Sequence, residues 1–188
     1  MKKIGLALEG GGLKGSYQIG AYYAFKQCHI KISGFVGTSI GAFNACLLAS
    51  GQSKELLELW QTIEPEKLLD IDQKFADYIN GKKETLKALK GLNSTVIGAL
   101  KQRGISTDKL RALADKMINK EKLYKNHKDF GLVTVKLHDF IPVYITKKEI
   151  PAEKLVDYLI ASCSLPIFKL APMIDDNIYI DGGFYDNC

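Results

Sequence analysis

A serine held between two glycines is the first feature of the chain that could do chemistry. The run Gly37-Thr38-Ser39-Ile40-Gly41 has the pattern G-x-S-x-G. Glycines at these positions let a strand turn sharply into a helix, which leaves the central serine exposed on a strained elbow as a nucleophile. An apolar segment precedes the run and a segment of small and apolar residues follows it. The pattern alone is equally consistent with a serine that only caps the following helix.

A glycine-rich run lies closer to the start of the chain, Gly10-Gly11-Gly12-Leu13-Lys14-Gly15, between an apolar and a helical segment. It matches the G-x-G-x-x-G pattern of dinucleotide sites, but the acidic residue that such sites need about 20 positions later is missing. The run also lacks the Gly-Lys-Ser/Thr ending of a P-loop. Its backbone N–H groups are therefore predicted to stabilise a developing oxyanion. The lysine either adds positive charge there or is an ordinary surface residue.

An aspartate followed by two glycines, Asp181-Gly182-Gly183, comes directly after a short apolar run near the end of the chain. A serine nucleophile needs a base, and a partly buried carboxylate with a raised pKa could take its proton directly. Asp-Gly is also a strong turn signal, so the run by itself favours a β-turn. None of His29, His127 and His138 stands in the hydrolase order of serine, acid and histidine. A triad with His127 or His138 in another order stays open, but the histidines are interpreted as structural or surface residues.

These three runs need a scaffold that brings them together, and a parallel α/β sheet would do so. A strand–helix–strand–helix start is typical of such a sheet. Its first two loops open on the same edge, which places Ser39 next to the Gly10–Gly12 loop. Over residues 53–126 the apolar residues recur at helical spacing and no strand is convincing, which predicts a helical insertion or cover. The predicted strands are 4–8, 34–36, 131–137, 141–146 and 177–180, and the other predicted helices are 14–28, 39–49 and 153–163.

Composition divides the chain into two unlike parts. Of the 17 glycines, ten lie in residues 1–51, and no acidic residue occurs between Glu9 and Glu55. This predicts a site-bearing front part and a charged, solvated back part. The net charge of +5 comes almost entirely from lysine. That charge is compatible with anionic lipid surfaces or simply with solvated helix faces, and the scarcity of arginine argues against nucleic-acid reading.

The sequence gives no sign of a metal site, a cofactor site, a signal peptide or a membrane-spanning helix. No ligand cluster has metal-binding spacing, so neither a metal nor a cofactor is predicted. The cysteines form no C-x-x-C pair; Cys28, Cys46 and Cys163 resemble small buried hydrophobic residues, which suits a reduced compartment. No signal peptide or membrane-spanning run is seen, so we expect a cytoplasmic protein with at most peripheral membrane contact. The oligomeric state stays undetermined.

Together and in this order, the three runs resemble the motifs of the patatin-like phospholipases. The block Ala161-Ser162-Cys163-Ser164-Leu165-Pro166, with Pro172 after it, also looks like the family's block before the acid. The resemblance spans about residues 4–187. It implies a three-layer α/β/α sandwich with a mainly parallel central sheet. It also implies a Ser–Asp dyad without histidine that hydrolyses acyl esters of lipids through an acyl-enzyme.

Carried over onto this chain, the resemblance assigns the nucleophile to Ser39, the base to Asp181 and the oxyanion hole to Gly10, Gly11 and Gly12. The supporting motif positions are Lys14, where many members have arginine, and Gly15, Gly37, Gly41, Gly182 and Gly183. Because the family domain usually continues further, we expect residues 1–188 to be one domain that lacks its C-terminal part.

The expected function is a serine hydrolase acting on phospholipid or lysophospholipid. Two alternatives stay open. One is an acyltransferase that uses the same acyl-serine, and the other is an inactive module that binds lipid surfaces.

Overall fold

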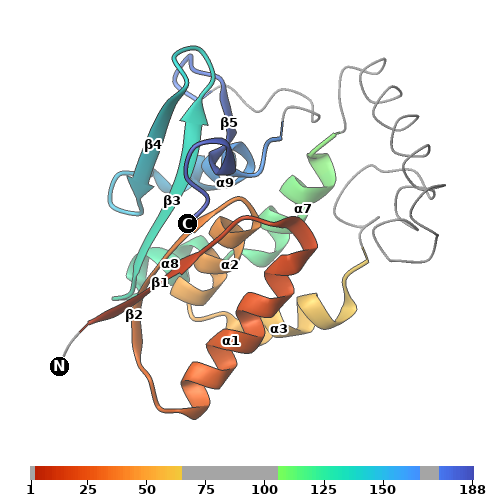
Figure 1. The fold of residues 1–188 in the computed structure, drawn as a ribbon, viewed down its shortest axis with the longest axis vertical. Helices are drawn as coiled ribbons and strands as arrows, with labels where there is room; N and C mark the ends of the chain where they lie inside the picture. Colours follow the sequence, from red (N-terminus) through yellow and green to blue (C-terminus); the bar gives the residue numbers. More distant parts are fainter. Residues whose placement is uncertain (1–2, 65–105, 166–173) are drawn as a thin grey trace.

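The computed structural model describes residues 3–64, 106–165 and 174–188 and builds them around a five-stranded sheet flanked by helices (Figure 1). The strands are β1 (Ile4–Leu8), β2 (Ile32–Thr38), β3 (Asp129–Lys136), β4 (Ile141–Thr146) and β5 (Tyr179–Asp181). The helices are α1 (Gly15–Gln27), α2 (Ile40–Ala49), α3 (Ser53–Thr62), α7 (Asp108–Met117), α8 (Lys120–Lys125) and α9 (Leu155–Ser162).

Strand β3 organises the sheet because it has three partners. The order is β1-β2-β3-β4, parallel from β1 through β3 and antiparallel between β3 and β4. Strand β5 pairs antiparallel with the end of β3, on the edge opposite β4. Strands β2 and β5 therefore follow one another along the same edge of β3 and run toward each other, β2 beside its lower part and β5 beside its upper part (Figure 1).

Helix α2 is the centre of the core. Every residue from Ile40 to Ala49 is buried, and the helix packs on β2 and β3. Its run of small and apolar residues explains this burial, because a helix that is apolar all round is stable only where every side is covered. Helix α9 packs beside it on β3 and β5. The start of the chain is thus bound to its end through β3.

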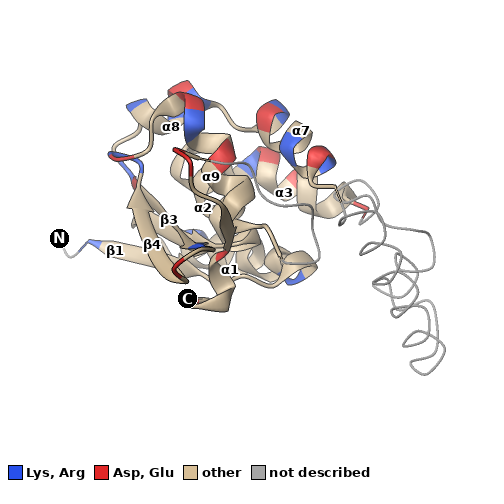
Figure 2. Ribbon diagram, turned by 90° about the horizontal axis from the view of Figure 1, so that it is seen from above, with Lys and Arg blue, Asp and Glu red and all other residues tan. Residues whose placement is uncertain are grey.

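The outer helices carry the charge. Lysine, arginine, aspartate and glutamate gather on α3, α7 and α8, whereas α2 and the strands next to it are nearly free of them (Figure 2). Helices α3 and α7 each bury a narrow apolar stripe through Leu56 and Leu110. The predicted contrast between a site-bearing front part and a solvated back part holds for α3, α7 and α8 (Figure 2) but not for α9 and β5, which also belong to the back part and are buried. Residues 65–105 of the predicted helical segment lie outside them.

The expected α/β sandwich is confirmed, with a sheet that is parallel at its start and mixed as a whole. The strand predicted at 34–36 extends further, over Ile32–Thr38, because it is paired on both edges. One expectation is wrong: Cys28 is exposed, because α1 turns another face, with Ile19, toward the core, whereas Cys46 and Cys163 are buried. Among the described helices, none has the length and apolar character needed to span a bilayer.

Candidate active site

Ser39 occupies a strained turn between β2 and α2. Its backbone has φ 55° and ψ −130°, a conformation that residues with a side chain rarely adopt. Ser39 stands at the N-cap of α2, yet its hydroxyl makes no capping hydrogen bond to this fully described helix. The interpretation as a simple helix cap is therefore disfavoured, and the hydroxyl is left to serve the site.

The two glycines of the elbow are required by close packing. A Cβ atom on Gly37 would lie 2.3 Å from the backbone of Gly41. A Cβ atom on Gly41 would lie 2.0 Å from the carbonyl oxygen of Leu8, at the end of β1. The elbow is thus pressed against the first strand, and this contact sets Ser39 beside the loop that follows β1.

Asp181 reaches the same place from the far end of the chain. In the β3 ladder Thr38 pairs with Val133 and Asp181 pairs with the next residue, Thr134. The residue after β2 and the last residue of β5 therefore meet at one point of β3. The Asp181 side chain is buried, and one of its oxygens accepts a hydrogen bond from Gly183 N–H at 2.8 Å.

The environment of Asp181 suits a base. Burial raises its pKa above the ordinary carboxyl value, while the Ser39 hydroxyl and the Gly183 amide act in the opposite direction with smaller effects. Its glycine neighbour makes this burial possible, because a Cβ atom on Gly182 would lie 2.4 Å from the carbonyl oxygen of Val133. Among the described residues, the groups named as acting on the carboxylate are the Ser39 hydroxyl and the Gly183 amide, and neither is a cation.

The glycine-rich loop lies across from Ser39 and presents its amides unequally. Gly10 N–H donates to the side-chain oxygen of Asn187 at 3.0 Å. Within the described residues, the amides of Gly11 and Gly12 have no acceptor. Gly12 has φ 57°, a conformation that favours glycine, and opens the short turn that leads into α1. Two amides at this helical start are thus available to an anion.

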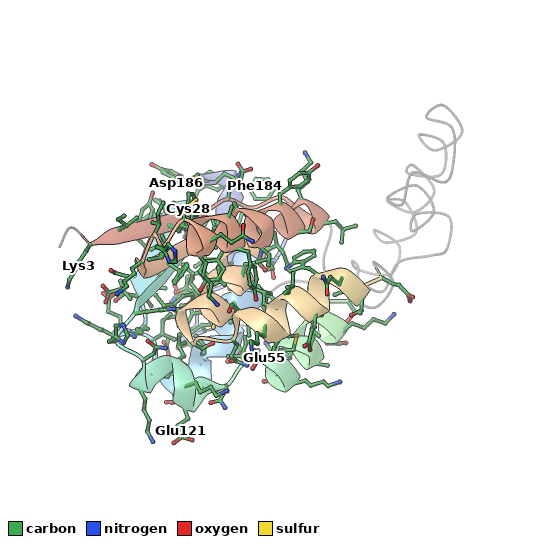
Figure 3. The ribbon with its side chains drawn as sticks, turned by 90° about the horizontal axis from the view of Figure 1, so that it is seen from below. Lys3, Cys28, Glu55, Glu121, Phe184 and Asp186 are labelled. Atoms are coloured by element: carbon green, nitrogen blue, oxygen red, sulfur yellow. The ribbon has the colours of Figure 1, made fainter. Side chains whose placement is uncertain are left out.

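A cavity of about 500 Å³ joins these groups. Within the described residues Asp181 is the one ionisable side chain among those that line it, and Lys14 and the histidines lie outside. The Lys14 side chain is exposed at the edge of the loop. The lining residues are Gly10, Gly11, Gly12, Ser39, Leu165, Asp181, Gly183, Phe184 and Asn187. Phe184 and Asp186 lie on the side of the molecule opposite Glu55 and Glu121 (Figure 3).

The remaining predicted positions support the site from outside the cavity. Gly15 packs where a Cβ atom would touch Trp60 at 3.0 Å and Asn44 at 3.1 Å, which brings the start of α1 against α2 and α3. His138 is exposed and bonds to Asp139. In the described part of the chain, no group of three or more His, Cys, Asp or Glu residues could hold a metal ion.

The sequence does not show what two residues do at the site, although one of them, Ser162, belongs to the block that starts at Ala161. Asn187 holds Gly10 through both its side chain and its backbone carbonyl. Ser162, at the end of α9, accepts a hydrogen bond from Ser39 N–H at 2.9 Å. Both contacts join segments that are far apart in sequence, and only the pairing of β2 and β5 on β3 brings those segments together.

Comparison with known proteins bears on the fold and the family of the chain. The chain aligns over its full length with VipD from Legionella pneumophila at a TM-score of 0.63 and 16% identity, and spans 47% of that protein's length. It is 42% identical over 62 residues to the uncharacterized protein YqhO of Bacillus subtilis (strain 168), which covers 32% of this chain and 21% of YqhO. The family model described as patatin-like phospholipase matches residues 6–188. The chain therefore belongs to the patatin-like phospholipase family.

Proposed function

We propose that the chain is a serine lipid acyl hydrolase that uses Ser39 as nucleophile and Asp181 as base. Family membership suggests lipid acyl hydrolase activity. The observation that carries the finer proposal is the meeting of β2 and β5 on neighbouring positions of β3, which sets both residues on one cavity. No other ionisable side chain of the described residues lines that cavity, so the carboxylate is the base within reach.

The reaction starts with proton transfer. As the Ser39 hydroxyl attacks the ester carbonyl, its proton passes to the Asp181 carboxylate. The tetrahedral oxyanion then accepts hydrogen bonds from the Gly11 and Gly12 amides. Collapse expels the alcohol, which takes the proton back, and leaves an acyl-serine. Water, deprotonated by Asp181, attacks the acyl-serine. As the ester bond breaks, the proton passes from Asp181 to the Ser39 oxygen and the fatty acid is released.

The raised pKa of Asp181 is what makes a carboxylate effective here. An ordinary carboxyl group, with a pKa near 4, is a weak base toward a hydroxyl at neutral pH. Burial lifts the pKa of Asp181 toward the working pH and improves the match. Within the described residues no lysine or arginine lines the cavity, and a cation there would lower the pKa again.

The substrate we propose is a phospholipid or lysophospholipid presented at a membrane surface. Leu165 and Phe184 give the cavity two apolar walls beside Ser39, which suits a fatty-acyl chain. Both side chains are exposed, at 39% and 46%, so an acyl chain can reach them directly from a lipid surface. Peripheral attachment is sufficient for this approach.

The test compares substitutions at the two proposed catalytic residues with substitutions at histidine. Ser39→Ala and Asp181→Ala should each lower hydrolysis of a lysophospholipid by about 10³-fold or more, the range found when a catalytic nucleophile or base is removed. His127→Ala and His138→Ala should keep wild-type rates. Retained hydrolysis in either of the first pair would reject the dyad. Loss of activity in a histidine variant would instead indicate a histidine base.

Two further readouts separate the alternatives. A fluorophosphonate probe should label wild-type Ser39 but not Ser39→Ala, and an inactive lipid-binding module would show no labelling of either. Product analysis with an added alcohol acceptor should still yield mainly free fatty acid. Predominant formation of a new ester would identify an acyltransferase.

A further inference from the structure

We propose that Ser162 is a positioning residue, which holds the nucleophile elbow in its reactive geometry; this rests on the proposed role of Ser39. Ser162 is the last residue of α9 and is completely buried. Its hydroxyl donates to the carbonyl oxygen of Val133 at 2.6 Å and accepts from Ser39 N–H at 2.9 Å. A single hydroxyl therefore connects the elbow to the central strand β3.

The elbow needs this connection because its own conformation leaves the Ser39 amide without a partner in the sheet. The regular ladder between β2 and β3 ends at Thr38, which pairs with Val133. One residue later the chain turns into positive φ, and the next ladder bond cannot form. The Ser162 hydroxyl takes the place of that bond, and a buried amide is thereby satisfied.

The same end of α9 also holds the base. The carbonyl oxygen of Ser164 accepts a hydrogen bond from Asp181 N–H at 2.8 Å. This contact is made by the main chain of Ser164 alone, so it does not depend on the Ser164 side chain and is kept when that side chain is replaced.

The carbonyl oxygen of Val133 lies between Ser162, which holds the elbow, and Gly182, which follows Asp181. It accepts the Ser162 hydroxyl, and it also lies so near Gly182 that a Cβ atom there would approach to 2.4 Å. If the Ser162 hydroxyl is removed, this carbonyl and the Ser39 amide both lose their partner inside the protein. The elbow is then free to relax away from its strained geometry, and Ser39 moves relative to Asp181. Misplacement of a reacting group by about 1 Å costs on the order of 10²-fold in rate.

The experiment compares Ser162→Ala with Ser164→Ala. The two serines are two positions apart and buried, with 0% and 2% exposure, and each hydroxyl donates to a backbone carbonyl at 2.6 Å. The Ser164 hydroxyl, however, donates to the carbonyl oxygen of Ile160 in α9, and within the described residues it has no hydrogen bond to the elbow or to β3. The measurements are kcat and KM for a soluble p-nitrophenyl ester and the rate constant of fluorophosphonate labelling, each per folded molecule. Amide hydrogen exchange at Ser39 is followed in parallel.

Ser162→Ala should lower kcat and the labelling rate constant by about 10²-fold with KM little changed. Ser164→Ala should stay within about twofold of wild type. A purely structural role for Ser162 would reduce the folded fraction but leave these per-molecule rates alone. Wild-type rates in Ser162→Ala, with Ser39 labelled normally, would overturn the positioning role while leaving the proposed function intact.

Failure of the wild-type protein to label would instead reject the proposed function, and amide exchange then decides what Ser162 does. We expect the Ser39 amide to be protected in the wild type and in Ser164→Ala, and to exchange faster in Ser162→Ala. Equal protection in all three proteins would show that Ser162 does not hold the elbow.

Discussion

The two glycine-rich segments of the site look alike in sequence and depend on glycine for different physical reasons. In the elbow, Gly37 and Gly41 lie where any side chain would collide with backbone, at 2.3 Å and 2.0 Å. In the loop after β1, Gly12 has nothing within 4 Å of its Cβ position, yet it has φ 57°. The elbow needs glycine for space, and the loop needs it for conformation and for access to its amides.

The proposed nucleophile and the proposed oxyanion hole are therefore held in place in different ways. The elbow is held by packing against Leu8 and by the end of α9, so its geometry belongs to the core. The loop is exposed and is tied to the rest of the site through Asn187. Substitutions in the first should act through folding, and substitutions in the second through the rate of reaction.

The largest effect is expected for Gly41→Ala. Its Cβ atom would meet the carbonyl oxygen of Leu8, which belongs to a strand and cannot move aside. We expect a loss of about 3 kcal/mol or more in the free energy of unfolding, at the upper end of the cost of overpacking. Urea denaturation followed by far-UV circular dichroism measures it. A loss below about 1 kcal/mol would show that the elbow is not closely packed.

Asp181→Asn, at the end of β5 beside the elbow, should have opposite effects on activity and on stability. Activity should fall by about 10³-fold, because an amide cannot take the Ser39 proton. Stability at pH 7 should rise. Since the pKa of Asp181 is raised in the folded state, the native protein binds protons more tightly than the unfolded chain and loses stability as the pH rises through that pKa.

The advantage of Asp181→Asn should therefore shrink as the pH falls toward the ordinary carboxyl pKa near 4. Thermal unfolding of both proteins between pH 4 and 8 checks this trend. A variant less stable than wild type at pH 7 would contradict the direction of the shift.

Gly12→Ala should have a smaller effect on stability and a visible effect on rate. Adopting positive φ costs a residue with a Cβ atom about 1–2 kcal/mol, while the open space around Gly12 removes any steric cost. We expect the fold to persist and kcat to fall about tenfold as the amide turns away from the oxyanion. Unfolding midpoints and esterase kinetics measured on the same preparation test this. If stability fell as far as in Gly41→Ala, the contrast between the two segments would be lost.

The smallest effect is expected for Gly20→Ala, which serves as the control for both. Gly20 lies inside α1 with nothing within 4 Å of its Cβ position and without positive φ. Alanine there should stabilise the protein by about 0.5–1 kcal/mol, because it lowers the backbone entropy of the unfolded chain. A small rise in the unfolding midpoint at unchanged activity is the expected result. A fall would mean that α1 makes a contact at this position.

The residues that the sequence predicted for the site lie together in the structure, because each motif is local. The patterns around Ser39, Asp181 and Gly10–Gly12 require particular residue types at short spacing, and the structure places all of them on one cavity. The strands and the buried helix after Ser39 follow from apolar runs of the right length. The exposed face of α1 was less accessible to prediction, because alternating small and aromatic residues around a helix do not show which side meets the core.

What escaped prediction depends on register between distant segments. Nothing in the order of residues shows that β5 continues along the edge of β3 already used by β2. That pairing decides that Ser162 meets the Ser39 amide and that Asn187 occupies the Gly10 amide. Motifs can therefore name the reacting groups, whereas the contacts that hold those groups in place emerge only from tertiary structure.

The edge of β3 that β2 and β5 share has a consequence for folding during synthesis. Strand β2 can pair early, but β3 and β5 are supplied much later in synthesis, and pairing of such distant segments is slow. If Ser39 and Asp181 act as proposed, a growing chain that carries Ser39 has no base beside it until residues 179–181 have left the ribosome and joined the sheet. Reactivity toward lipid would then depend on the pairing of β5 with β3, and a chain in which that pairing has not formed should be harmless to the membranes around it.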